Sequence, residues 1–165
     1  MLRKAYGRLL LSTLLALGPC LASAQVPVSA TTQHETFLSS PDARLARNKK
    51  LVYDFWREVV DAGQIDQIDK YVAENYIQHN PNVATGRRAL AEQIARNVKR
   101  QAAQAQIKAP VVAIVAEGNL VVVSLVSELP DPADSSKKYT TTWFDMFRIE
   151  NGKIVEHWDS AARLP

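Results

Sequence analysis

The sequence predicts an α+β domain in which three helices precede a curved antiparallel sheet and pack against one of its faces. Two observations support this prediction. Between residues 41 and 104, apolar residues recur at intervals of three and four, which is typical of amphipathic helices. From residue 110 onward, β-branched and aromatic residues dominate four runs that are separated by turn-forming residues. Helices followed by a meander of strands are typical of the α+β class.

The helical part of the chain carries recognisable start and stop signals. The first helix is expected to begin at Ser40-Pro41, because serine is a favourable N-cap and proline suits the first helical position. Gly63 is expected to end it. A short second helix is predicted from about residue 66, and a third over residues 87–104.

Strands are expected in one short segment between the second and third helices and in the four later runs. The short segment is "NYIQHN", which Pro81 ends. The later runs are "VVAIVAEG", "NLVVVSLVSEL", "KYTTTWFDMFRIE" and "KIVEHWDSAA". Asn151-Gly152 separates the last two, which predicts a tight hairpin.

The first 24 residues are typical of a secretory signal peptide. Arg3, Lys4 and Arg8 form a basic start, an apolar run follows, and Ala22-Ser23-Ala24 resembles a cleavage site. We therefore expect a periplasmic or secreted protein that begins at Gln25 and has no stable membrane insertion after cleavage. The alternative is lipoprotein processing, in which Cys20 becomes the lipidated first residue.

Without the signal, the 20 basic and 17 acidic residues of the full chain become equal in number, since three basic residues are removed. A nucleic-acid partner therefore loses its main support. Residues 25–40 have no sustained period and predict a flexible leader, with His34 solvated in it. The remaining domain spans residues 41–165.

The order of the predicted helices and strands, together with three sequence motifs, resembles the SnoaL-like branch of the nuclear transport factor 2-like superfamily. The residues that carry the resemblance are "NKKLVYDFWREVVDAGQIDQIDKYVAENYIQHNPNVATGRRAL", "IVAEGNLVVV" and "WFDMFRIENGKIVEHWD". The resemblance implies a cone in which the sheet wraps around the helices, with a pocket between its concave face and the first helix. It also implies cyclase chemistry without a cofactor, by intramolecular aldol condensation. A carboxylate on the last strand would be the general acid/base.

By position in the family motif, that carboxylate is Asp159. A second polar pocket residue, fourteen positions earlier, is Asp145, where the cyclase pattern would carry histidine. A base that removes a proton next to a carbonyl group needs a pKa that an apolar setting raises toward the working pH, and it must later return the proton. Asp145 and Asp159 are therefore the first two catalytic candidates, with a pair of solvated or His157-bonded strand carboxylates as the structural alternative.

Whether these residues share a face depends on the hairpin turn. A two-residue turn at Asn151-Gly152 places Asp145 opposite Trp158, with Asp159 on the other face. A three-residue turn with Gly152 as a bulge places Asp145 opposite His157. It also places Trp143 opposite Asp159. We favour the bulge, which collects these four residues on one face. It leaves an apolar outer face for a homodimer, made of Phe144, Met146, Ile154 and Trp158.

His79 is the third catalytic candidate, since it would face the same cavity from the "NYIQHN" strand and polarise a carbonyl or orient Asp159. It could equally cap backbone groups at the strand end. Tyr53, Trp56, Trp143 and His157 are the substrate-binding candidates. Tyr53 and Trp56 could instead be core residues.

Three functions are compatible with these residues. The first is a cofactor-free cyclase, isomerase or dehydratase that acts on a small hydrophobic carbonyl compound. The second is a module that binds a small apolar ligand without chemistry. The third is a metal site of His79, His157 and a carboxylate. Because these residues lack a specific ligand spacing, we expect no metal.

Overall fold

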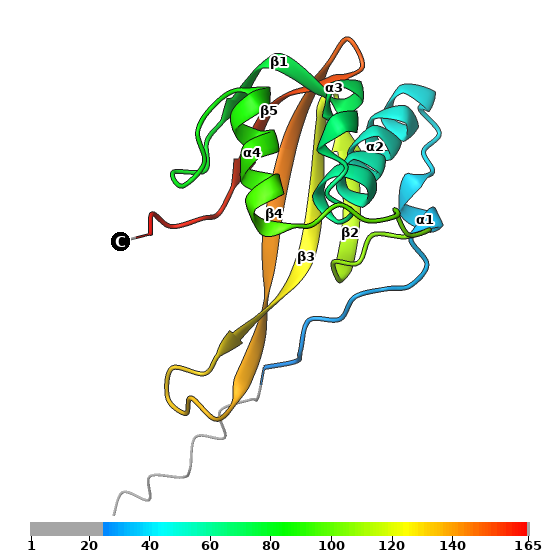
Figure 1. Ribbon diagram of the computed structural model, residues 1–165. Coiled ribbons are helices and arrows are strands. Elements are labelled where there is room, and N and C mark those ends of the chain that lie inside the picture. Colours follow the sequence, from blue (N-terminus) through cyan, green and yellow to red (C-terminus); the bar gives the residue numbers. More distant parts are fainter. Residues whose placement is uncertain (1–24, 165) are drawn as a thin grey trace, which may run out of the picture.

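The computed structural model describes residues 25–164 and confirms an α+β fold built on one five-stranded mixed sheet. The strands are β1 (Val72–Gln78), β2 (Val111–Glu117), β3 (Leu120–Pro130), β4 (Lys138–Glu150) and β5 (Lys153–Asp159), in the spatial order β1-β5-β4-β3-β2. Helices α2 (Ala43–Phe55), α3 (Ile68–Tyr71) and α4 (Arg87–Asn97) lie over one face of the sheet (Figure 1).

The first helix begins and ends close to the expected positions. Asp42, rather than Ser40, is its N-cap, and the Asp42 carboxylate accepts from Arg44 N at 2.7 Å. After Phe55 the helix widens into a π-helical segment, η1 (Trp56–Val60). Gly63 follows with a φ of 63°, the left-handed conformation that favours glycine at a helix end.

The remaining helical turns are shorter than the sequence suggested. The second helix consists of a 3₁₀ turn, η2 (Ile65–Gln67), and the single turn of α3. The third helix, α4, ends at Asn97 instead of Gln104. The apolar spacing of "LAEQIARNV" stops at Val98, so the polar residues beyond it have no face to pack.

The last four strands form the expected antiparallel meander, in which β3 and β4 make a long hairpin that projects from the body of the domain (Figure 1). The expectation of an entirely antiparallel sheet is wrong for the first strand. β1 joins the edge of β5 in parallel, with Gln78 beside His157 and Ile77 beside Glu156. This parallel pair brings the "QHN" segment next to the "EHWD" segment.

The register of the β4–β5 hairpin combines features of both expected turns. Asn151 (φ 49°) and Gly152 (φ 71°) form a two-residue turn, and Glu150 pairs with Lys153. The register then shifts, since Ile149 pairs with Ile154 but Arg148 pairs with Glu156. The extra residue, Val155, is a bulge in β5.

This bulge decides which residues share a face. Asp145 lies opposite Asp159, and Phe147 lies opposite His157, so all four side chains are on the inner face of the sheet. The favoured pairing of Asp145 with His157 and of Trp143 with Asp159 is therefore wrong. The shared face is nevertheless present, because the bulge lies in the strand instead of the turn.

The core lies between the inner face of the sheet and the helices. Val52, Val59, Val72 and Ile154 are fully buried there. Ile154 was expected on the outer face, and this prediction is wrong because Ile154 precedes the bulge and pairs with the buried Ile149.

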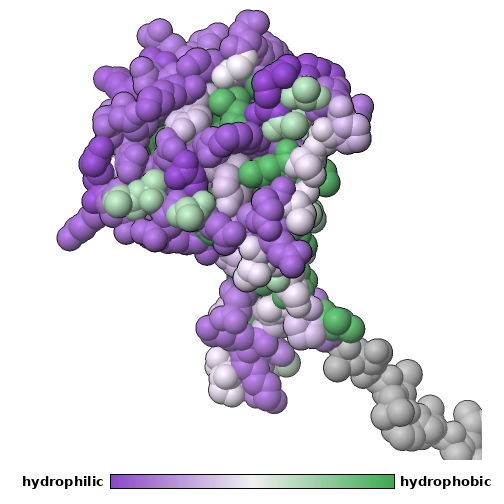
Figure 2. All heavy atoms as spheres, turned by 90° about the vertical axis from the view of Figure 1, so that its right-hand side faces the viewer, coloured by the Kyte–Doolittle hydropathy of each residue, from purple (hydrophilic) through white to green (hydrophobic). Residues whose placement is uncertain are grey.

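The outer face carries the other three residues of the expected apolar set. Phe144 is 50% exposed, and it lines a shallow depression of about 340 Å³ with Met146 and Trp158. On the side that bears α1 (Glu35–Leu38), the described surface is mainly hydrophilic, with smaller hydrophobic areas (Figure 2).

The segment expected as a flexible leader contacts the domain. Thr31 N donates to Val111 O at 3.0 Å, and Val28 N donates to Thr140 Oγ1 at 2.8 Å. His34 is buried, so the prediction of a solvated residue is wrong. Its ring is held at both nitrogens, by Tyr53 Oη at 2.9 Å and by Thr31 O at 3.0 Å.

The expected signal peptide, with Cys20, lies outside the described residues. Within residues 25–164, no helix has the length and apolar character needed to cross a membrane.

Candidate functional site

A cavity of about 180 Å³ lies between the inner face of the sheet and the helices. Most of its wall is apolar. It is lined by Phe55, Trp56, Val60, Tyr76, Leu90, Ile94, Asp145, Phe147 and His157. The helical residues come from α2, η1 and α4, while β1, β4 and β5 supply the rest. This is the position that the family resemblance implied for a pocket, between the sheet and the first helix.

Asp145 and His157 form a buried pair in the wall of this cavity. His157 Nε2 lies 2.8 Å from Asp145 Oδ1, and each residue is 6% exposed. The pair spans β4 and β5 diagonally, since Asp145 lies opposite Asp159 and His157 lies opposite Phe147. A carboxylate so removed from water requires a partner, and His157 provides one.

The proton on the other side of the His157 ring is fixed by Gln78. His157 Nδ1 lies 2.8 Å from Gln78 Oε1. The same Oε1 accepts from Asn80 N at 2.9 Å, while Gln78 Nε2 donates to Tyr76 Oη at 3.0 Å. These contacts orient the amide, so Gln78 must accept and His157 Nδ1 must carry a proton. A single further proton is then shared between His157 Nε2 and Asp145 Oδ1.

Two buried polar atoms of the cavity residues have no hydrogen-bond partner among the described residues. They are Asp145 Oδ2, an acceptor, and Trp56 Nε1, a donor. Leaving such an atom unpaired costs about 1–3 kcal/mol relative to solvation. Buried unpaired groups that line a cavity are therefore candidates for contact with a ligand.

Tyr76 adds a third polar group to the cavity. Its pKa is raised from the ordinary value of 10.0 by burial and, to a smaller degree, by the negative charges of Asp145 and Asp159. The phenol therefore stays protonated and remains a hydrogen-bond donor at neutral pH.

Asp159 lies next to this site but outside the cavity wall. Asp159 Oδ2 accepts from Asn80 Nδ2 at 2.6 Å, and Oδ1 accepts from Ala161 N at 3.0 Å. Both oxygens are thus engaged at the end of β5, where the carboxylate links the strand to the turn that follows β1. The cavity carboxylate is Asp145.

His79 does not reach the cavity. In β1 the inner positions are Tyr76 and Gln78, and by strand alternation the chain directs His79 outward. His79 Nε2 contacts Glu156 Oε1 at 2.7 Å, and its ring stacks on Trp158 with centroids 5.1 Å apart. The expectation that His79 faces the same cavity as Asp145 is wrong.

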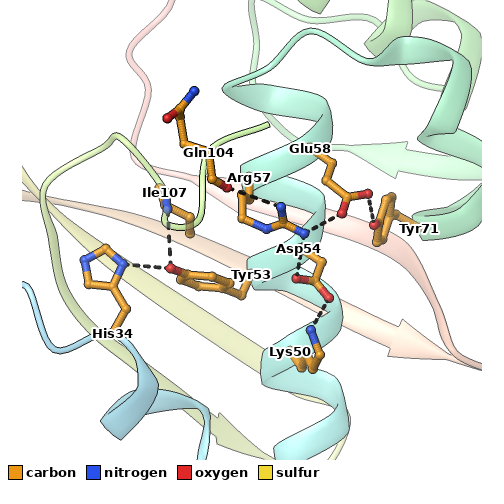
Figure 3. Close-up of polar contacts among 9 residues, drawn as sticks. All are labelled: His34, Lys50, Tyr53, Asp54, Arg57, Glu58, Tyr71, Gln104 and Ile107. Carbon is orange, nitrogen blue, oxygen red and sulfur yellow. Dashed lines mark hydrogen bonds and ion pairs between the residues drawn. The ribbon is translucent and has the colours of Figure 1, made fainter. Parts of the chain in front are cut away.

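Tyr53 is also directed away from the cavity. Its hydroxyl contacts His34 Nδ1 at 2.9 Å and accepts from Ile107 N at 3.3 Å, as Figure 3 shows. Figure 3 also shows that Asp54, Arg57, Glu58 and Tyr71 form a separate polar network. Trp143 packs against the core without lining the cavity. Of the four substrate-binding candidates, Trp56 and His157 line it.

Among the described residues, Asp145, His157 and Asp159 can bring one ligand atom each within 4.8 Å of one another. The side-chain atoms that could bind a metal ion, however, already have hydrogen-bond partners, except for Asp145 Oδ2. The metal set considered from the sequence is not assembled, since His79 lies on the opposite face of the sheet.

Sequence reasoning missed Gln78 and Tyr76. The signal was present in the alternation of β1, because Tyr76, Gln78 and Asn80 are spaced by two and so share a face. Their partners could not be identified without the parallel pairing of β1 with β5.

Comparison with known proteins gives a family and a fold. The sequence model of the SnoaL-like polyketide cyclases matches residues 50–165. A protein of Jannaschia sp. CCS1, provisionally named a SnoaL-like polyketide cyclase, is 15% identical with a TM-score of 0.50 and matches 74% of this chain and 91% of its own.

Two further structures are similar. TsrD from Streptomyces laurentii is 21% identical with a TM-score of 0.49, over 73% of this chain and 90% of its own. An LEH-like epoxide hydrolase from M. tuberculosis is 15% identical with a TM-score of 0.49, over 70% and 83%. Among curated proteins, no sequence matches this chain. At 15% identity, the likeness to the Jannaschia structure shows the fold alone.

Proposed function

This chain belongs to the SnoaL-like polyketide cyclase family, and we propose that it catalyses proton transfer of the cyclase or isomerase type on a small hydrophobic carbonyl compound. The observation that carries the proposal is the free Oδ2 of Asp145. This atom belongs to a buried carboxyl group in the wall of an apolar cavity, and its other oxygen is paired with His157.

The chemistry follows from the state in which His157 Nε2 holds the shared proton. Asp145 is then a carboxylate, and Oδ2 removes a proton from the carbon next to the carbonyl group. The electron pair of that C–H bond forms the carbon–carbon double bond of an enolate, whose charge lies on oxygen. His157 stabilises the carboxylate before the transfer and, through Gln78, keeps its orientation.

Two outcomes balance without a co-reactant. If the proton returns from Asp145 to a different carbon, the result is an isomerisation. If the enolate carbon attacks a second carbonyl carbon, a carbon–carbon bond forms, and the new alkoxide takes the proton back from Asp145. The second route is an aldol cyclisation. Dehydration begins with the same proton removal, so all three expected reactions share this first step.

We assign the base to Asp145 instead of Asp159 because of their surroundings. Asp159 has both oxygens in hydrogen bonds and lies outside the cavity wall, whereas Asp145 Oδ2 is unpaired. In this proposal Asp159 is a positioning residue. Asp159 accepts a hydrogen bond from the Asn80 side chain and so holds the turn after β1. The backbone N–H of Asn80 donates to Gln78 Oε1 and so orients the Gln78 amide.

The proposal is tested by exchange of hydrogen for deuterium in a simple ketone. The purified protein is incubated in D₂O with cyclohex-2-enone, and NMR follows loss of the protons next to the carbonyl. We expect exchange well above that of buffer alone. Asp134→Asn is the matched control for removal of a carboxylate, since Asp134 lies in an exposed loop, and it should leave the rate unchanged. A wild-type rate equal to the buffer rate would reject catalysis.

The alternative function is ligand binding without chemistry. It is favoured by the apolar wall of the cavity, which lies between the helices and the sheet. Binding of the ketone without any exchange would support this alternative over the enzyme.

Homodimerisation and export are further proposals. The exposed Phe144 and the neighbouring Met146 and Trp158 form an apolar area on the outer face of the sheet, which favours pairing with a second copy. Sedimentation should show a dimer at micromolar concentration, whereas only a monomer would contradict this proposal. Export rests on the N-terminal sequence, and the intact mass of the exported protein should correspond to a start at Gln25.

A further inference from the structure

The polar and apolar features of the cavity restrict the kind of ligand that fits. Its volume is about 180 Å³. An apolar protein cavity of about 150 Å³ holds one benzene molecule. Pockets for drug-sized ligands measure about 300–1,000 Å³. The cavity therefore holds one ring and a small substituent, and because it is open to solvent, the rest of a larger ligand can extend out of it.

The unpaired donor is Trp56 Nε1. Trp56 is the first residue of the π-helical segment η1, which is followed by a backbone contact from Asp61 N to Trp56 O at 2.8 Å. This wider turn holds the indole against the cavity, and π-helical turns are frequent at functional sites. An indole N–H donates and cannot accept, so a ligand atom that pairs with it must be an acceptor.

The unpaired acceptor, Asp145 Oδ2, belongs to the same cavity wall. A ligand that satisfies both atoms carries an acceptor for Trp56 and a transferable proton for Asp145. A carbonyl group with a hydrogen on the adjacent carbon has both, three bonds apart. A simple hydrocarbon of the same size has neither. An alcohol could pair with both atoms through its hydroxyl group, but it has no C–H proton acidic enough for the proposed transfer.

We propose that the natural ligand is a carbonyl compound that places one ring in the cavity, and that Trp56 Nε1 donates a hydrogen bond to its oxygen. This inference rests on the proposed function, since Asp145 acts on the carbon next to that oxygen. When the proton leaves, charge develops on the oxygen, and the Trp56 hydrogen bond strengthens. Trp56 is thus a catalytic residue that also selects for carbonyl compounds.

Binding can be measured without turnover by NMR of the indole N–H groups. The chain has 3 tryptophans, so three indole signals are expected, and Trp56→Phe identifies the signal of Trp56. Cyclohex-2-enone is the test ligand, and cyclohexene is the control of similar shape without the carbonyl group. We expect the enone, but not cyclohexene, to shift the Trp56 signal downfield.

The variants give a quantitative test. Trp56→Phe should weaken binding of the enone about tenfold more than binding of cyclohexene, which corresponds to one hydrogen bond. Tyr76→Phe is the matched variant, because it removes a different donor from the same cavity. A selective loss in Tyr76→Phe but not in Trp56→Phe would overturn the assignment. So would binding of the enone with an unchanged Trp56 signal, or no binding at millimolar concentration.

The inference and the proposed function fail in different ways. Enone binding at Trp56 without deuterium exchange would support the binding site and reject the proposed catalysis. Exchange with an unchanged Trp56 signal would support catalysis and reject the role of Trp56.

Discussion

Removing His157 should destabilise the protein more than removing its partner. His157→Leu keeps a side chain of moderate size but leaves Asp145 buried, with neither oxygen paired. Loss of one partner from a buried charged pair costs about 3–5 kcal/mol. Asp145→Leu leaves His157 Nε2 unpaired, but a neutral imidazole can be buried more cheaply than a carboxylate. The expected loss for this variant is about 1–3 kcal/mol.

The double variant distinguishes a coupled pair from two separate contributions. If the residues acted independently, the losses would add to about 4–8 kcal/mol. Replacing both members of a buried pair by apolar residues is often nearly neutral. We therefore expect Asp145→Leu with His157→Leu to lose less than about 3 kcal/mol, and less than His157→Leu alone.

Urea denaturation at pH 7, followed by circular dichroism, gives the free energy of unfolding of all four proteins. The wild type, the two single variants and the double variant form a complete cycle. A double variant that loses the sum of the two single losses would refute the reasoning, because it would show that Asp145 and His157 do not depend on each other.

Two further predictions concern stability away from the cavity. Glu156→Gln should lower stability at neutral pH, because hydrogen bonding to His79 and then the charge of Arg148 hold the pKa of Glu156 below its ordinary 4.5. A depressed pKa stabilises the fold above pH 4.5, so the difference from wild type should shrink as the pH falls below that value, and a constant difference in urea titrations would contradict it. Gly63→Ala should cost roughly 1–3 kcal/mol, since the new Cβ would lie 3.0 Å from Val98 O at a positive φ. Gly118→Ala has a similar φ but nothing within 4 Å, so it should cost less, and equal losses would show that the close contact is unimportant.

The elements of the fold were predictable from local signals. The β2–β5 meander follows from β-branched runs divided by turn residues, and the end of the first helix follows from Gly63. The family resemblance is confirmed by the match over residues 50–165. What the sequence could not give is the parallel pairing of β1, because strand neighbours far apart in the chain leave no local signal.

The site was predictable in part. The shared inner face of Asp145, His157 and Asp159 was expected, but for a different reason, since the bulge is at Val155 and not at Gly152. A bulge within a run such as "KIVEHWD" has no glycine to mark it. His79 was misplaced because its strand was recognised while its register against β5 was not.

The burial of His34 was missed because a polar segment without periodicity gives no sign of a docking contact. Its partner, Tyr53, was a substrate-binding candidate with a core residue as the alternative, and the structure supports the core alternative. Helical spacing alone cannot distinguish the two sides of a wide apolar stripe.

The rate of deuterium exchange in cyclohex-2-enone, compared between Asp145→Asn and Asp159→Asn, tests the central claim most directly. Both substitutions keep the shape of the side chain and remove one carboxylate, and thermal unfolding confirms that each variant is folded. The account predicts that Asp145→Asn loses on the order of 10²- to 10⁴-fold in rate, the usual range for a general base, while Asp159→Asn loses less than about tenfold. A large loss in Asp159→Asn with near-normal exchange in Asp145→Asn would contradict it.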